Sequence, residues 1–180
     1  MSDQVVFLFS GQGSHYYQMG RELYERHPGF RKWMLMGDGL ASDLIGLSVL
    51  EQLYNDPFRK SDRFDRTLYT HPAIFLVEYA LARTVMDMGI EPTHVLDSSL
   101  GGFAAAAVAG VLSFEEALTA VVEQAKVLEA QRPKVMYISC SRAHILPSIS
   151  QYYLWEVICE PVHFQKAIQL LESMASYTYL

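Results

Sequence analysis

The sequence holds 180 residues, of which 51% are hydrophobic and 19% are charged, and this globular composition excludes a disordered or fibrous chain. A formal net charge of -6 argues against nucleic-acid binding, because phosphate recognition needs a basic face. The apolar runs at residues 5–9 and 103–112 are too short to span a membrane, and the first has no signal-peptide flank. Two cysteines without metal-ligand spacing favour a cytoplasmic protein with no metal site.

The first half of the chain predicts one strand and several helices. Residues 5–10 are a short apolar run ended by a glycine loop at residues 11–14, which predicts a strand and a turn. A helical pattern then continues until Pro28. Residues 30–69 mix apolar and polar residues at helical spacing and predict several short helices, whereas residues 73–88 predict one strong helix.

The second half repeats this alternation. Ser113 and Glu116 have the spacing of a capping box, which predicts the start of a helix. The predicted elements are a strand at 92–96, helices at 103–109 and from 113 to about 130, a strand at 135–140, a helix at 161–173 and the start of a strand at 177–180. The alternation predicts an α/β fold, with a parallel sheet flanked by helices, in one domain of residues 1–180.

One serine lies where a predicted strand turns into a predicted helix. Residues 96–102 read Leu-Asp-Ser-Ser-Leu-Gly-Gly, a near match to the G-x-S-x-G nucleophile elbow, with Ser99 as the serine. Asp97 stands where the pattern has a glycine. We expect the turn to tolerate Asp97, or the carboxylate to cap the following helix, with a catalytic role as the less favoured alternative.

Four ordered segments, at residues 7–14, 70–75, 96–102 and 153–164, resemble motifs of the acyltransferase family that includes malonyl-CoA:acyl carrier protein transacylases. Within that family the chain is most similar to discrete, acyl hydrolase-like homologues that accompany polyketide synthases lacking built-in acyltransferase domains. The resemblance implies the α/β-hydrolase-like large subdomain of the acyltransferase fold.

The resemblance also implies a two-step chemistry. The family's serine, matched by Ser99, attacks an acyl thioester, and the acyl group then passes from the serine to the phosphopantetheine thiol of an acyl carrier protein or to water. The backbone amides at Gln12 and Leu100 match the family's oxyanion donors. We therefore expect partners that carry an acyl group, namely acyl carrier protein or acyl-CoA, and no cofactor, metal, nucleic acid or membrane.

Some of the family's parts have no match in this sequence. Members carry a catalytic histidine on a small ferredoxin-like subdomain, and that insertion, expected near residues 131–135, is missing, as is the family's C-terminal segment. His15 and His71 lie in segments expected to approach the serine, but a structural role is the favoured expectation for both. The sequence leaves open whether the chain is active, and whether it is part of a longer one.

A further departure concerns the acyl group. Gln124 falls where malonyl-selective members have an arginine, and an amide cannot form the charged bidentate pair with a carboxylate. We therefore expect hydrolysis or transfer of a non-malonyl acyl group rather than malonyl transfer, although Gln124 also fits a plain helix-surface residue. The alternative is an inactive homologue that binds a carrier protein or synthase.

Overall fold

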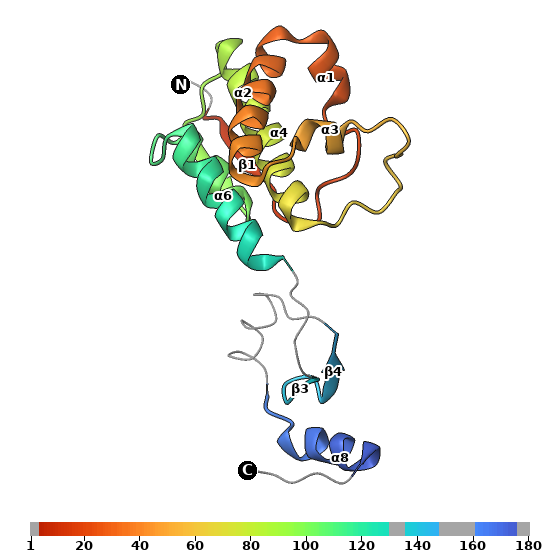
Figure 1. Cartoon of the computed structure of the whole chain (residues 1–180). Coiled ribbons are helices and arrows are strands. Elements are labelled where there is room, and N and C mark those ends of the chain that lie inside the picture. Colours follow the sequence, from red (N-terminus) through yellow and green to blue (C-terminus); the bar gives the residue numbers. More distant parts are fainter. Residues whose placement is uncertain (1–3, 130–135, 148–160, 176–180) are drawn as a thin grey trace. The chain divides into compact units, whose positions relative to one another are not determined.

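The computed structural model describes residues 4–129, 136–147 and 161–175, and the chain divides into two compact units, Met1–Lys126 and Val127–Leu180 (Figure 1). The expected insertion point near residues 131–135 and the strand expected at residues 177–180 lie outside the described residues. The assignment of residues 1–180 to one domain stays a prediction.

The first unit contains a small parallel sheet. Strand β1 (Val6–Phe9) pairs with β2 (His94–Asp97) so that Val6 is opposite His94 and Phe9 is opposite Asp97. Helix α5 (Gly101–Val108), which follows β2, contacts both strands. The predicted fold class, a mixed α/β fold with a parallel sheet and flanking helices, is therefore confirmed.

Six helices form the rest of the first unit (Figure 1). They are α1 (Arg21–Arg26), α2 (Pro28–Ile45), α3 (Val49–Leu53), α4 (Thr67–Asp87), α5 (Gly101–Val108) and α6 (Phe114–Leu128). Helix α4 contacts α2, α3 and α5 and carries the longest run of buried side chains, residues 70–76. It is the helix on which α2, α3 and α5 pack.

Helix α2 corrects the prediction of several short helices in residues 30–69. It is one helix of 18 residues, although Gly37 lies in its middle. A Cβ added at Gly37 would clash with Leu76 of α4, so this glycine allows the two helices to approach closely. Sequence patterns count such a glycine only as a helix breaker, because the partner helix is distant in the chain.

Helix α4 begins at Thr67, six residues before its predicted start at residue 73. Pro72 therefore lies inside the helix, where it removes the backbone hydrogen bond that its N–H would donate to Leu68. Two other predicted helix boundaries are confirmed. Gly89, with a φ of 86°, follows the end of α4. At the start of α6, Ser113 and Glu116 exchange both capping-box hydrogen bonds, of 2.8 and 3.1 Å.

The described part of the second unit holds a hairpin and one helix. Strand β3 (Tyr137–Ser139) lies within the predicted strand at residues 135–140 and pairs antiparallel with β4 (His144–Leu146), which was not predicted. Helix α8 (Phe164–Met174) confirms the predicted helix and buries Ala167. Phe164, the first residue of this helix, is 62% exposed.

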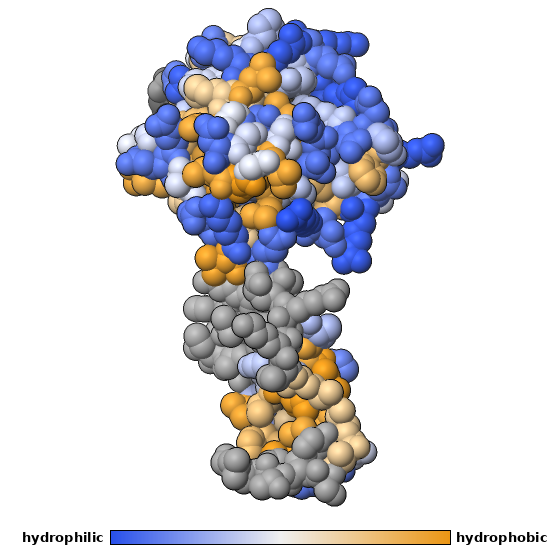
Figure 2. All heavy atoms as spheres, in the orientation of Figure 1, coloured by the Kyte–Doolittle hydropathy of each residue, from blue (hydrophilic) through white to orange (hydrophobic). Residues whose placement is uncertain are grey.

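The surface of the first unit is mixed. Figure 2 shows one face that is mainly hydrophilic with hydrophobic areas set into it. Leu8 and Leu96, which are opposite each other on β1 and β2, are 73% and 60% exposed. Among the residues that the structure describes, no helix has the length and apolarity to cross a membrane, and no cluster of His, Cys, Asp and Glu could hold a metal ion.

Candidate active site

Two loops meet at one edge of the parallel sheet. Because β1 and β2 run in the same direction and Phe9 is opposite Asp97, the residues that follow each strand emerge side by side. Residues 10–14 form the loop after β1, and residues 98–100 form the turn between β2 and α5. The edge at the carboxyl ends of parallel strands is where α/β proteins place their ligands.

The turn after β2 has the backbone of a nucleophile elbow. Ser99 has a φ of 53°, in the left-handed region that side chains other than glycine rarely adopt, and its side chain is exposed. The Ser98 N–H donates to the Phe9 carbonyl at 3.0 Å, and the Gly102 N–H donates to the Ser99 carbonyl at 3.1 Å. These bonds hold the strained serine between the strand and the helix.

Two glycines allow the strands and the helix to approach this turn. A Cβ added at Gly11 would lie 2.7 Å from the Ser98 carbonyl oxygen and 3.0 Å from Ser99 Cβ. A Cβ added at Gly101 would lie 2.7 Å from the carbonyl carbon and oxygen of Phe9. Both positions are closed to any side chain, so the turn depends on backbone packed directly against backbone.

The predicted oxyanion positions lie at these two loops. The Leu100 nitrogen is 3.5 Å from the position that a Cβ on Gly11 would occupy, and Gln12 is the next residue of that loop. Leu100 is buried, with 4% of its surface exposed, whereas Gln12 is exposed. The structure therefore brings Ser99, Leu100 and the loop that carries Gln12 to one place.

Asp97 is accommodated without strain at Gly102. Asp97 is the last residue of β2 and is exposed. A Cβ on Gly102 would lie only 3.1 Å from Asp97 Oδ2, so the absence of a side chain at Gly102 leaves space for that oxygen. Among residues 4–129, no side-chain hydrogen bond caps α5 at its N-cap Leu100, so capping by the Asp97 carboxylate in that form is not observed. Its charge beside the first turn of α5 is still favourable for the helix dipole.

No histidine of the first unit hydrogen-bonds to Ser99 within the described residues 4–126. His27 caps α2, since its Nδ1 accepts the Phe30 N–H at 3.3 Å. His94 begins β2 and its Nδ1 lies 3.0 Å from the Thr93 hydroxyl. The Nδ1 of His15 accepts the Gly13 N–H at 3.3 Å, which ties this histidine to the glycine loop rather than to the serine.

His71 is the most perturbed histidine of the first unit. It lies in α4 with 5% of its surface exposed, and its Nδ1 has no hydrogen-bond partner. Burial, with a smaller repulsion from His15, lowers the pKa of His71 to about 4. Burial also lowers the pKa of His15. Both rings are thus held in the neutral form near pH 7, as expected for packed structural histidines.

Gln124 is an exposed residue of α6. It follows Glu123, which forms an ion pair with Lys126, and it precedes the buried Ala125. No hydrogen bond connects it to the two loops at the sheet edge within residues 4–126. The described structure shows Gln124 as an exposed residue of α6, and its role in acyl binding stays a prediction.

One polar side chain near the site was missed from the sequence. Glu78 of α4 is half-buried, and its Oε1 accepts both the N–H and the hydroxyl of Ser10, each at 2.6 Å. The available signal was a single carboxylate inside the apolar run of residues 73–82. A charge in such a run needs a partner, although the sequence does not say which.

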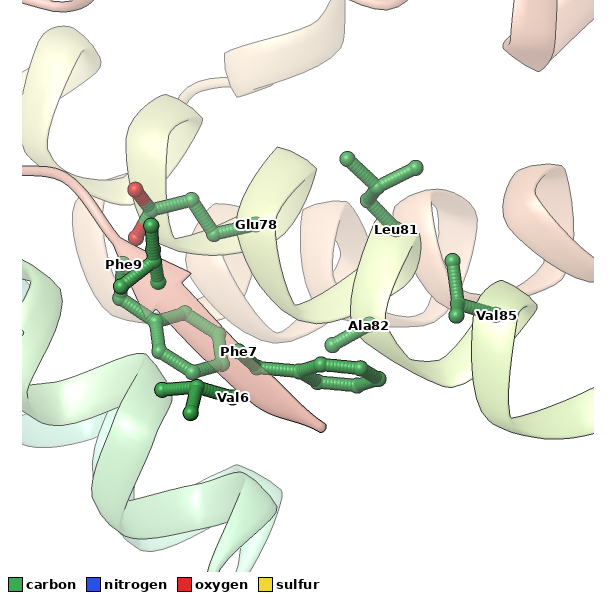
Figure 3. A pocket seen from close by; sticks show the side chains of 8 residues that line it. Val6, Phe7, Phe9, Glu78, Leu81, Ala82 and Val85 are labelled. Atoms are coloured by element: carbon green, nitrogen blue, oxygen red, sulfur yellow. The ribbon is translucent and has the colours of Figure 1, made fainter. Parts of the chain in front are cut away.

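A cavity of about 310 Å³ lies between β1 and α4, lined by Phe7, Phe9, Glu78, Leu81 and Val85 among others (Figure 3). A second hollow of about 350 Å³ lies around residues 91–95 and the end of α5. Neither is lined by Ser99, Gln12 or Leu100. The Ser99 turn therefore opens to the surface rather than into either of these two cavities.

Comparison with known proteins identifies the family. Residues 6–136 match the model of the acyl transferase domain. The chain belongs to the acyl transferase domain family. It is 52% identical over 128 residues to the polyketide biosynthesis acyltransferase homolog BaeD of Bacillus velezensis, covering 71% of this chain and 40% of that protein. The chain thus spans well under half the length of this relative.

Solved structures agree with this assignment. The acyl transferase domain of ZmaA matches with a TM-score of 0.66 and 33% identity, over 71% of this chain and 30% of that one. A malonyl CoA-acyl carrier protein transacylase from Clostridium perfringens matches with a TM-score of 0.58 and 25% identity, over 70% and 38% of the two chains. The predicted family resemblance is therefore confirmed.

Proposed function

We propose that the chain carries the nucleophile of an acyltransferase homologue of polyketide biosynthesis, with Ser99 as the residue that accepts the acyl group. The observation that supports this most strongly is the φ of 53° at Ser99, on an exposed turn between a strand and a helix. Strain of this kind is retained at nucleophile elbows because it projects the hydroxyl toward substrate. The polyketide role rests on the likeness to BaeD.

In the proposed reaction, Ser99 Oγ attacks the carbonyl carbon of an acyl thioester. The new C–O bond forms as the serine proton passes to a base. Collapse of the tetrahedral intermediate then breaks the C–S bond, and the base returns the proton to the departing sulfur, which leaves as a thiol. The N–H groups of Gln12 and Leu100 are proposed to bind the negatively charged oxygen of that intermediate, and one such donor contributes roughly 3–4 kcal/mol.

The proposed substrates are acyl thioesters of an acyl carrier protein or of CoA, as the name of the related Clostridium transacylase indicates for that enzyme. A malonyl group is disfavoured, because Gln124 offers no positive charge for its second carboxylate. Water that attacks the acyl-serine ester would complete a hydrolysis, and a carrier-protein thiol would complete a transfer.

A second candidate is an inactive homologue that binds a carrier protein or a synthase. The observation in its favour is that, within residues 4–126, no histidine nitrogen makes a hydrogen bond to the Ser99 hydroxyl and could act as its base. A serine without a base is a weak nucleophile near neutral pH. The two candidates differ in one measurable property, the formation of a covalent acyl-serine.

Intact-mass spectrometry tests this difference. The chain is incubated with acetyl, hexanoyl and malonyl thioesters of CoA and of a phosphopantetheine-bearing carrier protein. We expect an adduct of acetyl or hexanoyl mass in the wild-type chain and in Ser98→Ala, a matched neighbour, and none in Ser99→Ala. An adduct that survives in Ser99→Ala would overturn the assignment, and no adduct with any thioester would favour the binding homologue.

A further inference from the structure

Glu78 joins the central helix to the glycine loop. One carboxylate oxygen, Oε1, accepts the Ser10 N–H and the Ser10 hydroxyl at 2.6 Å each, and Figure 3 shows the side chain reaching from α4 toward the end of β1. Ser10 directly precedes Gly11, so this restraint acts where the loop begins.

The loop itself is permissive. Gln12 lies between two glycines, and Gly13 has a φ of 106°. The other hydrogen bonds of the loop are local. The Ser14 hydroxyl and N–H donate to the Gly11 carbonyl at 2.9 and 3.3 Å, the Ser14 hydroxyl lies 2.9 Å from the Ser10 hydroxyl, and the Gly13 N–H donates to His15 Nδ1. Within residues 4–126, the Glu78 bonds are the side-chain hydrogen bonds that connect residues 10–14 to α4.

Helix α4 is a rigid anchor for these bonds. Ile74, Phe75 and Ala82, one turn to either side of Glu78, are each at most 6% exposed. Burial raises the pKa of Glu78, and the two bonds from Ser10 oppose that rise. Its second oxygen, Oε2, is buried without a hydrogen-bond partner. The hydrogen bonds from Ser10 therefore offset part of the cost of burying this carboxyl group.

We propose that Glu78 is a positioning residue: through Ser10 it holds the glycine loop against the Ser99 turn, so that the Gln12 N–H faces the acyl oxygen. The glycine loop and the Ser99 turn are already close together, since there is no space for a Cβ on Gly11 next to Ser98 and Ser99. A small movement of the loop would therefore change their contact. The inference rests on the proposed function, in which the Gln12 amide is an oxyanion donor.

The first test measures the rate of acyl-serine formation at saturating and at low thioester concentrations. We expect Glu78→Ala to lower the saturating rate by about 10- to 100-fold, which is less than the loss of a whole oxyanion donor, with little change in the half-saturating concentration. Glu78→Gln retains an acceptor for Ser10 and should recover part of the rate. Asp87→Asn, at the exposed end of the same helix, is the matched control and should react as wild type.

The second test is independent of catalysis. Amide NMR spectra of the wild type and of the same variants report the backbone surroundings of Ser10, Gln12 and Leu100. We expect Glu78→Ala to move all three signals, Glu78→Gln to move mainly Ser10, and Asp87→Asn to move none.

These two readouts separate the claims. If the wild type forms no adduct, the proposed function fails, and the spectra still decide whether Glu78 fixes the loop. If the wild type reacts and folded Glu78→Ala reacts equally fast, or if the Gln12 and Leu100 signals stay in place when Glu78 is removed, the positioning role is overturned.

Discussion

The oxyanion side and the base side of Ser99 are built to different extents. On the oxyanion side, Gly11 and Gly101 bring backbone against backbone, and Ser99 is held at a φ of 53°. On the base side, no histidine of the first unit makes a hydrogen bond to the serine within residues 4–126. Backbone geometry is encoded by short stretches of sequence, whereas a side-chain base has to be delivered by another segment. A nucleophile turn can therefore be complete while its proton transfer is not.

The largest expected effect comes from disrupting the close backbone contact on the oxyanion side. Gly101→Ala places a Cβ 2.7 Å from the Phe9 carbonyl group, which is backbone and cannot move aside, so we expect a loss of about 2–3 kcal/mol in the free energy of unfolding. Urea denaturation measures this. Gly39→Ala, where a Cβ would meet nothing within 4 Å, is the control and should gain about 0.5–1 kcal/mol from better helix propensity. Equal midpoints for the two variants would refute the close approach.

A smaller effect is expected from a substitution that tests the oxyanion side while the chain still folds. Gly11→Ala puts a Cβ 3.0 Å from Ser99 Cβ and 2.7 Å from the Ser98 carbonyl oxygen, so the loop must move away from the turn. We expect acyl-serine formation to slow by about tenfold, since misplaced groups cost about that much or more. A rate within twofold of wild type in the folded variant would show that the loop does not assist the serine.

The smallest effect concerns His71, which the sequence offered as a candidate base. Its folded-state pKa of about 4 is below the value of 6.5 for an unfolded chain, so the unfolded state binds the proton first as pH falls. His71 therefore stabilises the fold above pH 6.5, and this contribution is lost as the pH falls from 6.5 to 4.

His71→Gln removes that pH dependence, and unfolding curves at pH 7, 5.5 and 4.5 measure it against His94→Gln, an exposed control. Because His71 makes no hydrogen bond to Ser99, the same variant should form the acyl-serine at a rate within threefold of wild type. A much slower reaction, with unchanged stability, would instead identify His71 as the base.

Much of the fold and the position of Ser99 follow from local sequence. The strand at residues 5–10, the Ser113 capping box and the turn at Ser99 each depend on neighbouring residues, and each was predictable. The length of α2 was not, because Gly37 is explained by Leu76 of another helix. The pairing of Glu78 with Ser10 was missed for the same reason, since 68 residues separate them.

The most direct measurement is a crystal structure of the chain after reaction with a fluorophosphonate, which leaves a tetrahedral phosphonyl group on a nucleophilic serine. The account predicts a single adduct on Ser99, with one phosphonyl oxygen within about 3.1 Å of both the Gln12 and the Leu100 nitrogens, as oxyanion donors require. An adduct on another residue, or a phosphonyl oxygen that points away from both amides, would contradict it.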